Sequence, residues 1–351
     1  MSGAKKTVFK AGLETLYHSR LFRLMAPMAQ GCGVIFTLHR VEPDPGHDFW
    51  PNKILSITPD FLKTVIERCL SAGLDVVSLD EMAARLEAGE TERRFAVFTL
   101  DDGYKDNLEH AAPVFRDYDC PFAIYLCSGL PDGDAELWWL ALEEIIRQET
   151  ELRFTLDGAE ETHAIASTSE KTACFEHIYW WLRAAPVERQ YGFIRALCGR
   201  YGYDMAALCR SISLTWDEVR ALSADPLVTI GAHTSRHLPL AKLRQEAARS
   251  DIAEGAARLS AELGVSPQHF SYPYGDPGSA GPRECALAES LGFRSAVTTQ
   301  PGMLDTQSQR KMHALPRVSL NGLYQEGRYV DVFLSGAPFA LYNGLKRLRS
   351  A

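Results

Sequence analysis

The sequence predicts an α/β fold in which parallel strands close into a barrel covered by helices, with one largely helical insertion. Short runs rich in β-branched and aromatic residues recur along the 351-residue chain, each followed by a helical pattern, and one long stretch interrupts this rhythm. Alternating strands and helices are typical of a parallel sheet covered by helices, and seven or eight repeats are enough to close a barrel.

Eight runs are the predicted strands, and helix starts are legible between them. The strands span residues 33–38, 74–78, 95–100, 121–127, 227–232, 269–272, 294–298 and 314–319. Thr58 is an N-cap followed by Pro59 at the first helical position. Thr215 and Glu218 have the spacing of a capping box at the start of another helix.

The barrel is expected to span residues 31–340, and three segments depart from its repeating pattern. Residues 1–30 are expected to form an amphipathic helix, whose apolar stripe over 12–28 docks on the barrel or, as the alternative, makes peripheral contact with a membrane. Residues 131–213, rich in tryptophan and charge, form an inserted helical cap with a short hairpin at "LRFTLDG". Residues 341–351 form a basic tail.

The composition narrows the class of partner and the compartment. A net charge of -8 without a long basic run argues against nucleic acid and anionic membranes as partners. Eight cysteines with no C-x-x-C pair indicate buried free thiols in a reducing compartment. Charged residues interrupt the N-terminal segment, which lacks the apolar core of a signal peptide, so a cytoplasmic location is expected. The chain has no run of 18 apolar residues and therefore no expected transmembrane segment.

Polar residues stand at the carboxyl ends of several predicted strands. In parallel α/β barrels the loops at that end converge on one site, so residues far apart in the sequence are expected to meet there. They are His39, Asp101, Asp102, His233, the segment 272–275 and Arg317.

His233 and His237 are the most specific part of this pattern. If the loop turns helically, their i, i+4 spacing points both imidazoles the same way, and a carboxylate from another strand completes a metal-binding set. Two histidines and one carboxylate suit zinc, with iron, cobalt, nickel or manganese as alternatives. Two histidines four residues apart on a polar loop also occur without any function, and the paired aspartates upstream favour the metal interpretation.

The adjacent Asp101 and Asp102 fit the same site. Two neighbouring carboxylates repel each other, and a divalent cation would lower the pKa of a coordinating carboxylate and stabilise its neighbour's charge. One aspartate can then bind the metal while the other accepts a proton from water as a general base. A turn in which one aspartate caps the next helix is the alternative, but it leaves the preceding apolar strand and the histidine pair unexplained.

Three segments resemble the first three motifs of the polysaccharide deacetylase family, also called the NodB homology family or carbohydrate esterase family 4. They are "FTLDDGY" (98–104), "HTSRH" (233–237) and "FSYPYG" (270–275). Three further segments are similar to a subgroup with His-Arg-Val and Leu-Pro-Arg elements, namely "TLHRV" (37–41), residues 57–82 and "ALPRVSLNG" (314–322).

The resemblance implies a distorted (β/α) barrel of about seven strands and metal-dependent removal of an N-acetyl group from a hexosamine-containing carbohydrate. Matched residue by residue, it implies that Asp101 is the catalytic base and that Asp102, His233 and His237 hold the metal. It also implies a group around the substrate and its oxyanion. In that group Thr234 braces the histidine loop and the Tyr274 backbone N–H binds the oxyanion, with Tyr104, Pro273 and Gly275 beside them.

The sequence lacks the residues that the family uses for two functions, the orientation of the base and the supply of the general acid. The arginine that orients the base is missing from the third motif, where Ser271 and Tyr272 stand, and Arg317 is the predicted replacement. The usual Leu-x-His that supplies the general acid has no match, and we consider His39 or His313 for this role.

Two alternative functions stay open from the sequence. One is a non-catalytic carbohydrate-binding relative, which would not need a general base. The other is an amidohydrolase that acts on a small non-sugar amide. Tryptophans of the insertion could stack on sugar rings, which would favour a glycan substrate, but they are more simply explained as the core of the cap.

Overall fold

Seven parallel strands form the closed barrel at the centre of the protein. The computed structural model describes residues 3–90 and 92–350, and the side chains of residues 7–90 and 92–345. Around the ring the strands follow the order β1 (Gly33–Leu38), β12 (Leu315–Ser319), β11 (Ser295–Pro301), β10 (His269–Ser271), β9 (Val228–Ala232), β6 (Phe122–Leu126) and β5 (Phe95–Asp102). Pairing of β5 with β1 closes the ring, so the predicted barrel of about seven strands is confirmed.

One of the eight predicted strands, 74–78, forms only a short addition to the ring. β4 (Asp75–Val76) pairs with the first residues of β5, beside the start of β6. A second short pair, β2 (Arg40–Val41) and β3 (Ser56–Ile57), is also parallel and lies outside the barrel.

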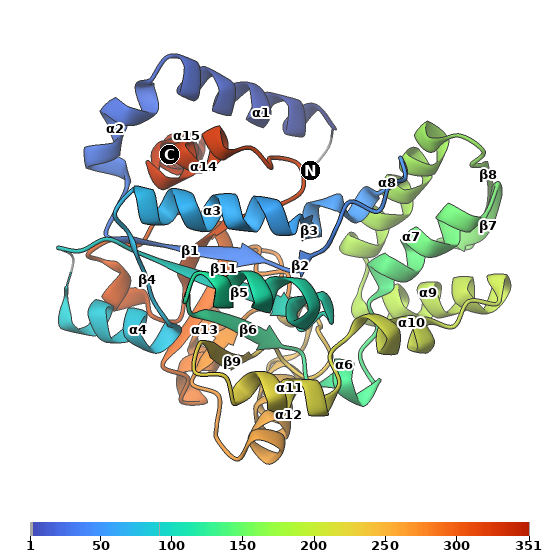
Figure 1. Cartoon of the computed structure of the whole chain (residues 1–351). Helices are drawn as coiled ribbons and strands as arrows, with labels where there is room; N and C mark the ends of the chain where they lie inside the picture. Colours follow the sequence, from blue (N-terminus) through green and yellow to red (C-terminus); the bar gives the residue numbers. More distant parts are fainter. Residues whose placement is uncertain (1–2, 91, 351) are drawn as a thin grey trace.

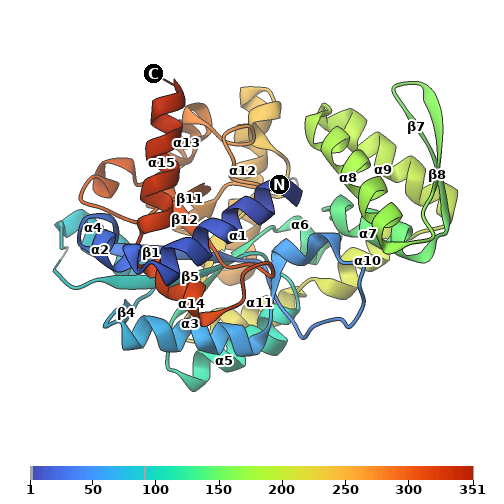
Figure 2. The same ribbon diagram turned by 90° about the horizontal axis from the view of Figure 1, so that it is seen from above.

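Helices cover the outside of the barrel (Figures 1 and 2). They are α3 (Pro59–Ser71), α4 (Leu79–Ala88), α5 (Ala112–Asp117), α11 (Trp216–Ser223), α12 (Gln245–Leu263), α13 (Pro282–Ser290) and α14 (Gly327–Leu334). Short helical turns are η1 (Pro51–Leu55), η2 (Asn107–Ala111), η3 (Leu240–Lys242) and η4 (Ser308–Lys311). The predicted caps are present, because Thr58 accepts a hydrogen bond from the Phe61 backbone and Thr215 and Glu218 form a capping box.

The side chains of β5 show how the barrel delivers polar groups to one end. Val97 and Thr99 point into the barrel, while Phe98 and Leu100 pack outward beneath the helices. Asp101 follows in the inward series, at the carboxyl end of the strand. The apolar interior therefore ends in a polar layer at the mouth of the barrel.

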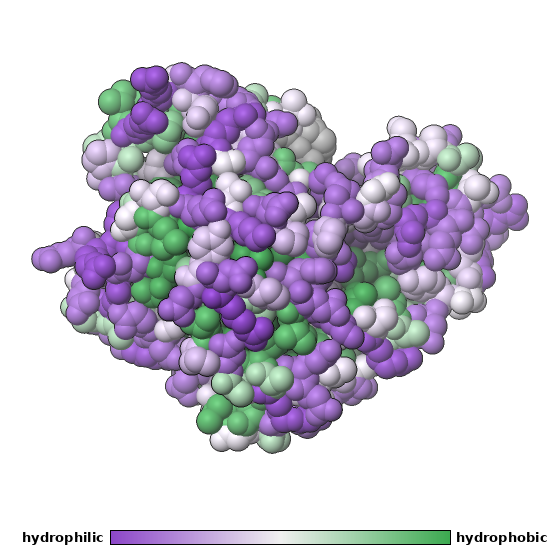
Figure 3. All heavy atoms as spheres, viewed as in Figure 1, coloured by the Kyte–Doolittle hydropathy of each residue, from purple (hydrophilic) through white to green (hydrophobic). Residues whose placement is uncertain are grey.

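The insertion forms a largely helical cap beside that mouth, as predicted (Figures 1 and 2). It contains α6 (Gly129–Asp132), α7 (Trp138–Gln148), α8 (Thr168–Ala184), α9 (Val187–Tyr201) and α10 (Met205–Ile212), with the antiparallel hairpin β7 (Glu151–Leu156) and β8 (Ala159–Ala164). Trp138 and Trp139 are buried in the cap's own core, whereas Trp180 is 48% exposed. Hydrophobic side chains line the hollow between cap and barrel (Figure 3).

The N-terminal segment forms two helices where the sequence predicts one. α1 (Gly3–His18) and α2 (Leu21–Ala29) are separated at Arg20, whose φ of 58° interrupts the helical backbone. Leu13 and Leu16 are buried in the main core, whereas Leu24 and Met28 are 78% and 90% exposed.

The chain ends in α15 (Ala337–Ser350), which contacts α2 and α14. The basic tail expected over 341–351 is thus helical as far as the structure describes it. No helix within the described residues is long and apolar enough to cross a membrane.

Candidate active site

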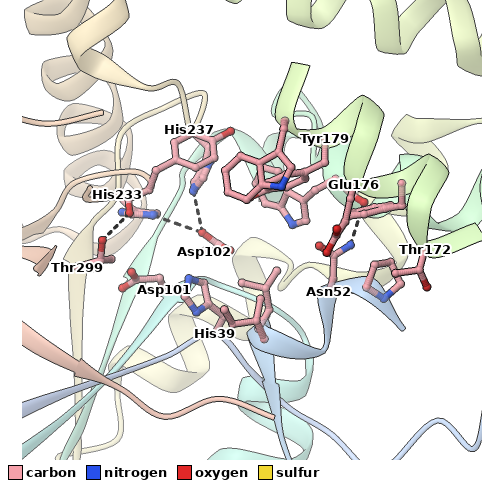
Figure 4. A pocket seen from close by; sticks show the side chains of 17 residues that line it. His39, Asn52, Asp101, Asp102, Thr172, Glu176, Tyr179, His233, His237 and Thr299 are labelled. Carbon is pink, nitrogen blue, oxygen red and sulfur yellow. Dashed lines mark hydrogen bonds and ion pairs between the residues drawn. The ribbon is translucent and has the colours of Figure 1, made fainter. Parts of the chain in front are cut away.

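Six of the predicted site residues line a cavity between the barrel mouth and the cap, namely His39, Asp101, Asp102, His233, His237 and Tyr274 (Figure 4). The cavity has a volume of about 180 Å³. Its floor comes from strand ends, with His39 after β1, Asp101 and Asp102 at the end of β5, and His233 and His237 after β9. This convergence follows from the parallel topology, which brings the carboxyl end of every strand to the same side of the barrel.

Asp102, His233 and His237 are arranged as a metal-binding set. The Nε2 atoms of His233 and His237 lie 3.3 and 3.1 Å from the same Asp102 oxygen, Oδ1, and all three residues are buried. Two ligand atoms each about 2.1 Å from a tetrahedral zinc ion would be roughly 3.4 Å apart. Apart from these imidazoles, no described residue provides a polar hydrogen for the buried Oδ1 atom. The donor set therefore fits a divalent transition metal.

Unusual backbone conformations hold these ligands. Asp102 has a φ of 78°, and in the loop after β9 Thr234 and His237 have φ values of 62° and 56°. Left-handed conformations in non-glycine residues cost of order 1–3 kcal/mol each and persist where the surrounding structure enforces them. The helical turn predicted between His233 and His237 is wrong, because these left-handed residues direct the loop back toward Asp102 instead.

Hydrogen bonds fix the orientation of the histidine loop. His233 donates from Nδ1 to the Ser271 carbonyl at 2.7 Å, which leaves Nε2 facing Asp102. Thr234 accepts a hydrogen bond at Oγ1 from the His237 backbone N–H at 3.1 Å. Thr234 thus sits as a brace inside the loop, the position that the resemblance implies for it.

Arg317 forms a two-pronged ion pair with Asp101. Its Nη1 and Nη2 atoms donate to Oδ1 and Oδ2 of Asp101 at 2.7 and 2.6 Å, and both residues are almost fully buried. Nη2 also donates to the Ser271 hydroxyl at 3.0 Å, and Nε donates to the Thr298 carbonyl at 2.9 Å. A planar guanidinium held at every nitrogen orients the carboxylate rigidly.

The electrostatics of the floor keep both aspartates ionised. Burial by itself raises the pKa of Asp101, but the charge and hydrogen bonds of Arg317 outweigh it and hold the pKa below its usual range. Burial acts the same way on Asp102, and His237 and His233 hold its pKa well below the usual range. Burial lowers the pKa of His233, yet the hydrogen bond to Asp102 raises it overall.

Tyr274 stands above the histidines, between Pro273 and Gly275. Its φ is 62°, and no described residue accepts a hydrogen bond from its backbone N–H. The Tyr274 hydroxyl accepts a hydrogen bond from Trp138 Nε1 at 2.9 Å, and the Arg183 guanidinium lies 4.1 Å from the centre of its ring. Gly275 is required here, since a Cβ atom would lie 2.6 Å from the Thr299 backbone nitrogen.

The remaining predicted residues divide between the site and its surroundings. His39 lines the cavity, and burial lowers its pKa although the two aspartates act in the opposite direction. Tyr104 is fully buried in the hydrophobic cluster of the cap, with the Arg40 guanidinium 5.3 Å from its ring centre. His313 precedes β12 at the opposite end of the barrel and donates to the Phe293 carbonyl, so its proposed acid role is wrong.

The cavity walls include residues that the sequence patterns did not single out. Asn52 and Leu55 come from η1, while Thr172, Glu176 and Tyr179 come from α8 of the cap (Figure 4). No motif marks them, because their place depends on how the cap packs against the barrel.

The comparisons with known proteins agree with this architecture. Residues 172–296 match the polysaccharide deacetylase family. The matched region includes the histidine pair and the segment 270–275, whereas the paired aspartates lie before it. No curated protein matches the sequence.

Solved structures with the same fold include several deacetylases. The Streptococcus pyogenes deacetylase PplD in complex with acetate is 13% identical, with a TM-score of 0.54, and the alignment covers 82% of this chain and 92% of PplD. IcaB from Ammonifex degensii is 16% identical, with a TM-score of 0.52 and coverage of 85% and 97%. The de-N-acetylase from Aggregatibacter actinomycetemcomitans is 14% identical, with a TM-score of 0.51 and coverage of 83% and 95%.

Proposed function

We propose that this chain uses a bound divalent metal ion to remove N-acetyl groups from a hexosamine-containing polysaccharide or oligosaccharide. The chain carries a polysaccharide deacetylase domain and is a hydrolase of amide carbon–nitrogen bonds. One observation carries the proposal. A buried Asp-His-His set and an arginine-held aspartate face the same cavity at the barrel mouth.

Asp102, His233 and His237 are the residues that would hold the metal. Zinc is the proposed ion on ligand chemistry, with cobalt, nickel, manganese and iron as alternatives. When bound, such an ion supplies Lewis-acid chemistry, which polarises a carbonyl and makes water more acidic.

Asp101 is the proposed general base. The pKa of its carboxyl is held below the usual range, so the group is ionised at neutral pH and can accept a proton from water. Three donors occupy the carboxylate, two from Arg317 and one from Ser271. A carboxylate has about four acceptor sites, so room remains for one water hydrogen bond.

The Tyr274 backbone N–H is the proposed oxyanion donor. Hydrolysis of an amide develops negative charge on the carbonyl oxygen, and a fixed N–H stabilises that charge. This donor is free of described partners and belongs to a residue that lines the cavity. His39 is the proposed proton donor to the departing amine, since it lines the same cavity as Asp101 and its lowered pKa makes its protonated form a stronger acid.

The walls of the cavity support a sugar substrate. Phe175, Tyr179 and Trp180 of α8 supply aromatic faces, on which the apolar side of a sugar ring can stack. Asn52 and Glu176 supply groups that can bind hydroxyls. A flat apolar site for a small amide would not need this combination of aromatic faces and groups that bind hydroxyls.

Acetate release from a panel of N-acetylated oligosaccharides, with and without a chelator, tests the proposal. We expect activity that disappears on complete metal removal and returns with zinc. Asp101→Asn should lose activity while it binds metal as the wild type does, and Asp102→Asn should lose both. Asp60→Asn, with a 95% exposed side chain on α3, is the matched control and should behave as the wild type. Activity confined to small non-sugar amides would contradict the proposal.

The proposal also includes a cytoplasmic location and peripheral contact of residues 12–28 with a membrane. All eight cysteines are free, and seven of them are buried, which supports a reducing compartment. Leu24 and Met28 project into solvent from α2, which supports apolar contact with a bilayer surface. Sedimentation with phosphatidylcholine vesicles should fall for the double variant Leu24→Glu, Met28→Glu, and equal binding of the two proteins would exclude the membrane contact.

A further inference from the structure

A second group of metal-ligating side chains lies in the cap, on the hairpin β7–β8 and on α8 (Figure 1). Glu161 and His163 are two residues apart on β8, so their side chains share one face of the hairpin. His177 reaches them from α8. The Nε2 atoms of His163 and His177 lie 2.8 and 3.1 Å from the same Glu161 oxygen, Oε2.

This cluster repeats the donor arrangement at the barrel mouth. In both places two imidazole Nε2 atoms converge on one carboxylate oxygen, and all three ligand atoms lie within 4.8 Å of one another. Among the side chains that the structure describes, these are the two groups with this property. Two histidines and one carboxylate form a typical ligand set for zinc, with open positions for water.

The cap cluster is both oriented and accessible. The Phe154 ring stacks on His163 with centres 5.2 Å apart and an interplanar angle of 15°, which fixes the plane of that imidazole. The side chains of Glu161, His163 and His177 are 30%, 35% and 46% exposed. An ion can therefore enter from solvent without opening the fold. A simple ion pair would need only one histidine, whereas the structure aims two at the same oxygen.

We propose that Glu161, His163 and His177 bind a second divalent transition-metal ion, with zinc favoured by the ligand chemistry. The ion would tie the hairpin to α8. Because α8 also carries Glu176 and Tyr179 into the cavity, metal in the cap would fix the helix that forms one cavity wall. The site stands on its own residues, independent of the function proposed for the barrel mouth.

Zinc stoichiometry of the full chain tests this proposal. After chelator treatment and dialysis, zinc is titrated by calorimetry, and bound metal is counted by equilibrium dialysis. We expect two equivalents for the wild type. The variant His233→Ala, His237→Ala should keep one equivalent, and the variant His163→Ala, His177→Ala should also keep one. Combining all four substitutions should remove both.

Controls separate this site from the barrel site and from loss of structure. His18 pairs with Glu14 at the surface as a single His-Glu pair, so His18→Ala is the matched control and should still bind two equivalents. Glu161→Gln leaves both imidazoles in place and should weaken the cap site at least tenfold, with an unchanged far-ultraviolet circular dichroism spectrum. In the His233→Ala, His237→Ala background, zinc should raise the unfolding temperature.

Two results would overturn the proposal. One is a His233→Ala, His237→Ala protein that is folded and binds no zinc. The other is a His163→Ala, His177→Ala protein that binds as many equivalents as the wild type with the same affinity. If only the barrel site fails, the wild type binds one equivalent and the His163→Ala, His177→Ala variant binds none, which supports the cap site and rejects the barrel metal.

Discussion

Replacement of Arg317 by methionine should destabilise the fold and remove catalysis. Methionine is similar in length and fills the site with apolar atoms, but it leaves Asp101 as a buried carboxylate without its counter-charge. Both residues are at most 2% exposed. Breaking a buried ion pair by removing one partner costs about 3–5 kcal/mol. A domain is typically stable by about 5–15 kcal/mol, so the variant should fold with a reduced margin.

Urea denaturation of four proteins measures this loss. The proteins are the wild type, Arg317→Met, Asp101→Asn and the double variant. The double variant carries neither charge, and we expect it to recover most of the loss, with a coupling free energy of about 3–5 kcal/mol between the two positions. Additive losses in the two single variants would refute the buried pair as the source of the effect.

Kinetics of the same series test the positioning role of Arg317. A base that is no longer oriented should lose a factor of about 10²–10⁴ in kcat, the range that general base catalysis supplies. Arg317→Lys keeps a positive charge without the two-pronged geometry, so we expect a partial rescue of stability and a smaller rescue of kcat. Metal stoichiometry should not change, because Arg317 contacts Asp101 and not the metal-binding set. A kcat equal to that of the wild type in Arg317→Met would refute the reasoning.

Three other predictions follow from single positions. Glu143 is buried, and burial raises its pKa to about 7 from the ordinary 4.5, so the folded protein loses stability as pH rises between these values, by roughly 3 kcal/mol in total. Glu143→Gln should abolish that loss, so the variant should have a higher free energy of unfolding than the wild type at pH 8 and nearly the same at pH 4. A difference between the two proteins that does not depend on pH would contradict this prediction. His39→Ala should bind metal normally and lose turnover, whereas His313→Ala should retain full turnover; equal rates in the two would exclude His39 as the acid. Gly103→Ala should destabilise the fold, because the new Cβ atom would lie 2.1 Å from Leu126 Cδ1 and the φ of 94° disfavours any side chain. It should also weaken metal binding, because residue 103 directly follows Asp102, and an unchanged metal affinity would contradict this prediction.

The strands could be predicted from the sequence because parallel strands buried on both faces appear as short, nearly continuous apolar runs. All eight runs contain a strand, and most strand ends agree within one or two residues. β11 is the exception, because it extends three residues beyond its predicted end, to Pro301. In the run 74–78 only Asp75 and Val76 pair, with the first residues of β5. The break after α1 carried no signal, since Arg20 adopts the left-handed conformation without a glycine or proline nearby.

The cavity walls could not be predicted from local patterns, because they depend on contacts between segments far apart in the chain. Asn52 donates from its side chain to Glu143 at 2.7 Å and to the Trp139 carbonyl at 2.9 Å, which joins η1 to α7 of the cap. Asn52 and Glu143 are 91 positions apart, and neither belongs to a motif. The floor was accessible to prediction because strand order alone brings its residues together, whereas the walls require the packing of the cap.

The position of Arg317 shows how a guanidinium reaches Asp101 although the segment 270–275 has no arginine. Inward-facing side chains from different strands of a closed barrel meet in one layer near its axis. Ser271 on β10 is small, and its hydroxyl accepts a hydrogen bond from the guanidinium that comes from β12, on the other side of β11. A large side chain at 271 would compete with Arg317 for that space beside Asp101. The arginine absent from one strand and the serine found there are therefore two parts of one arrangement, in which the charge next to the carboxylate is kept and the strand that supplies it differs.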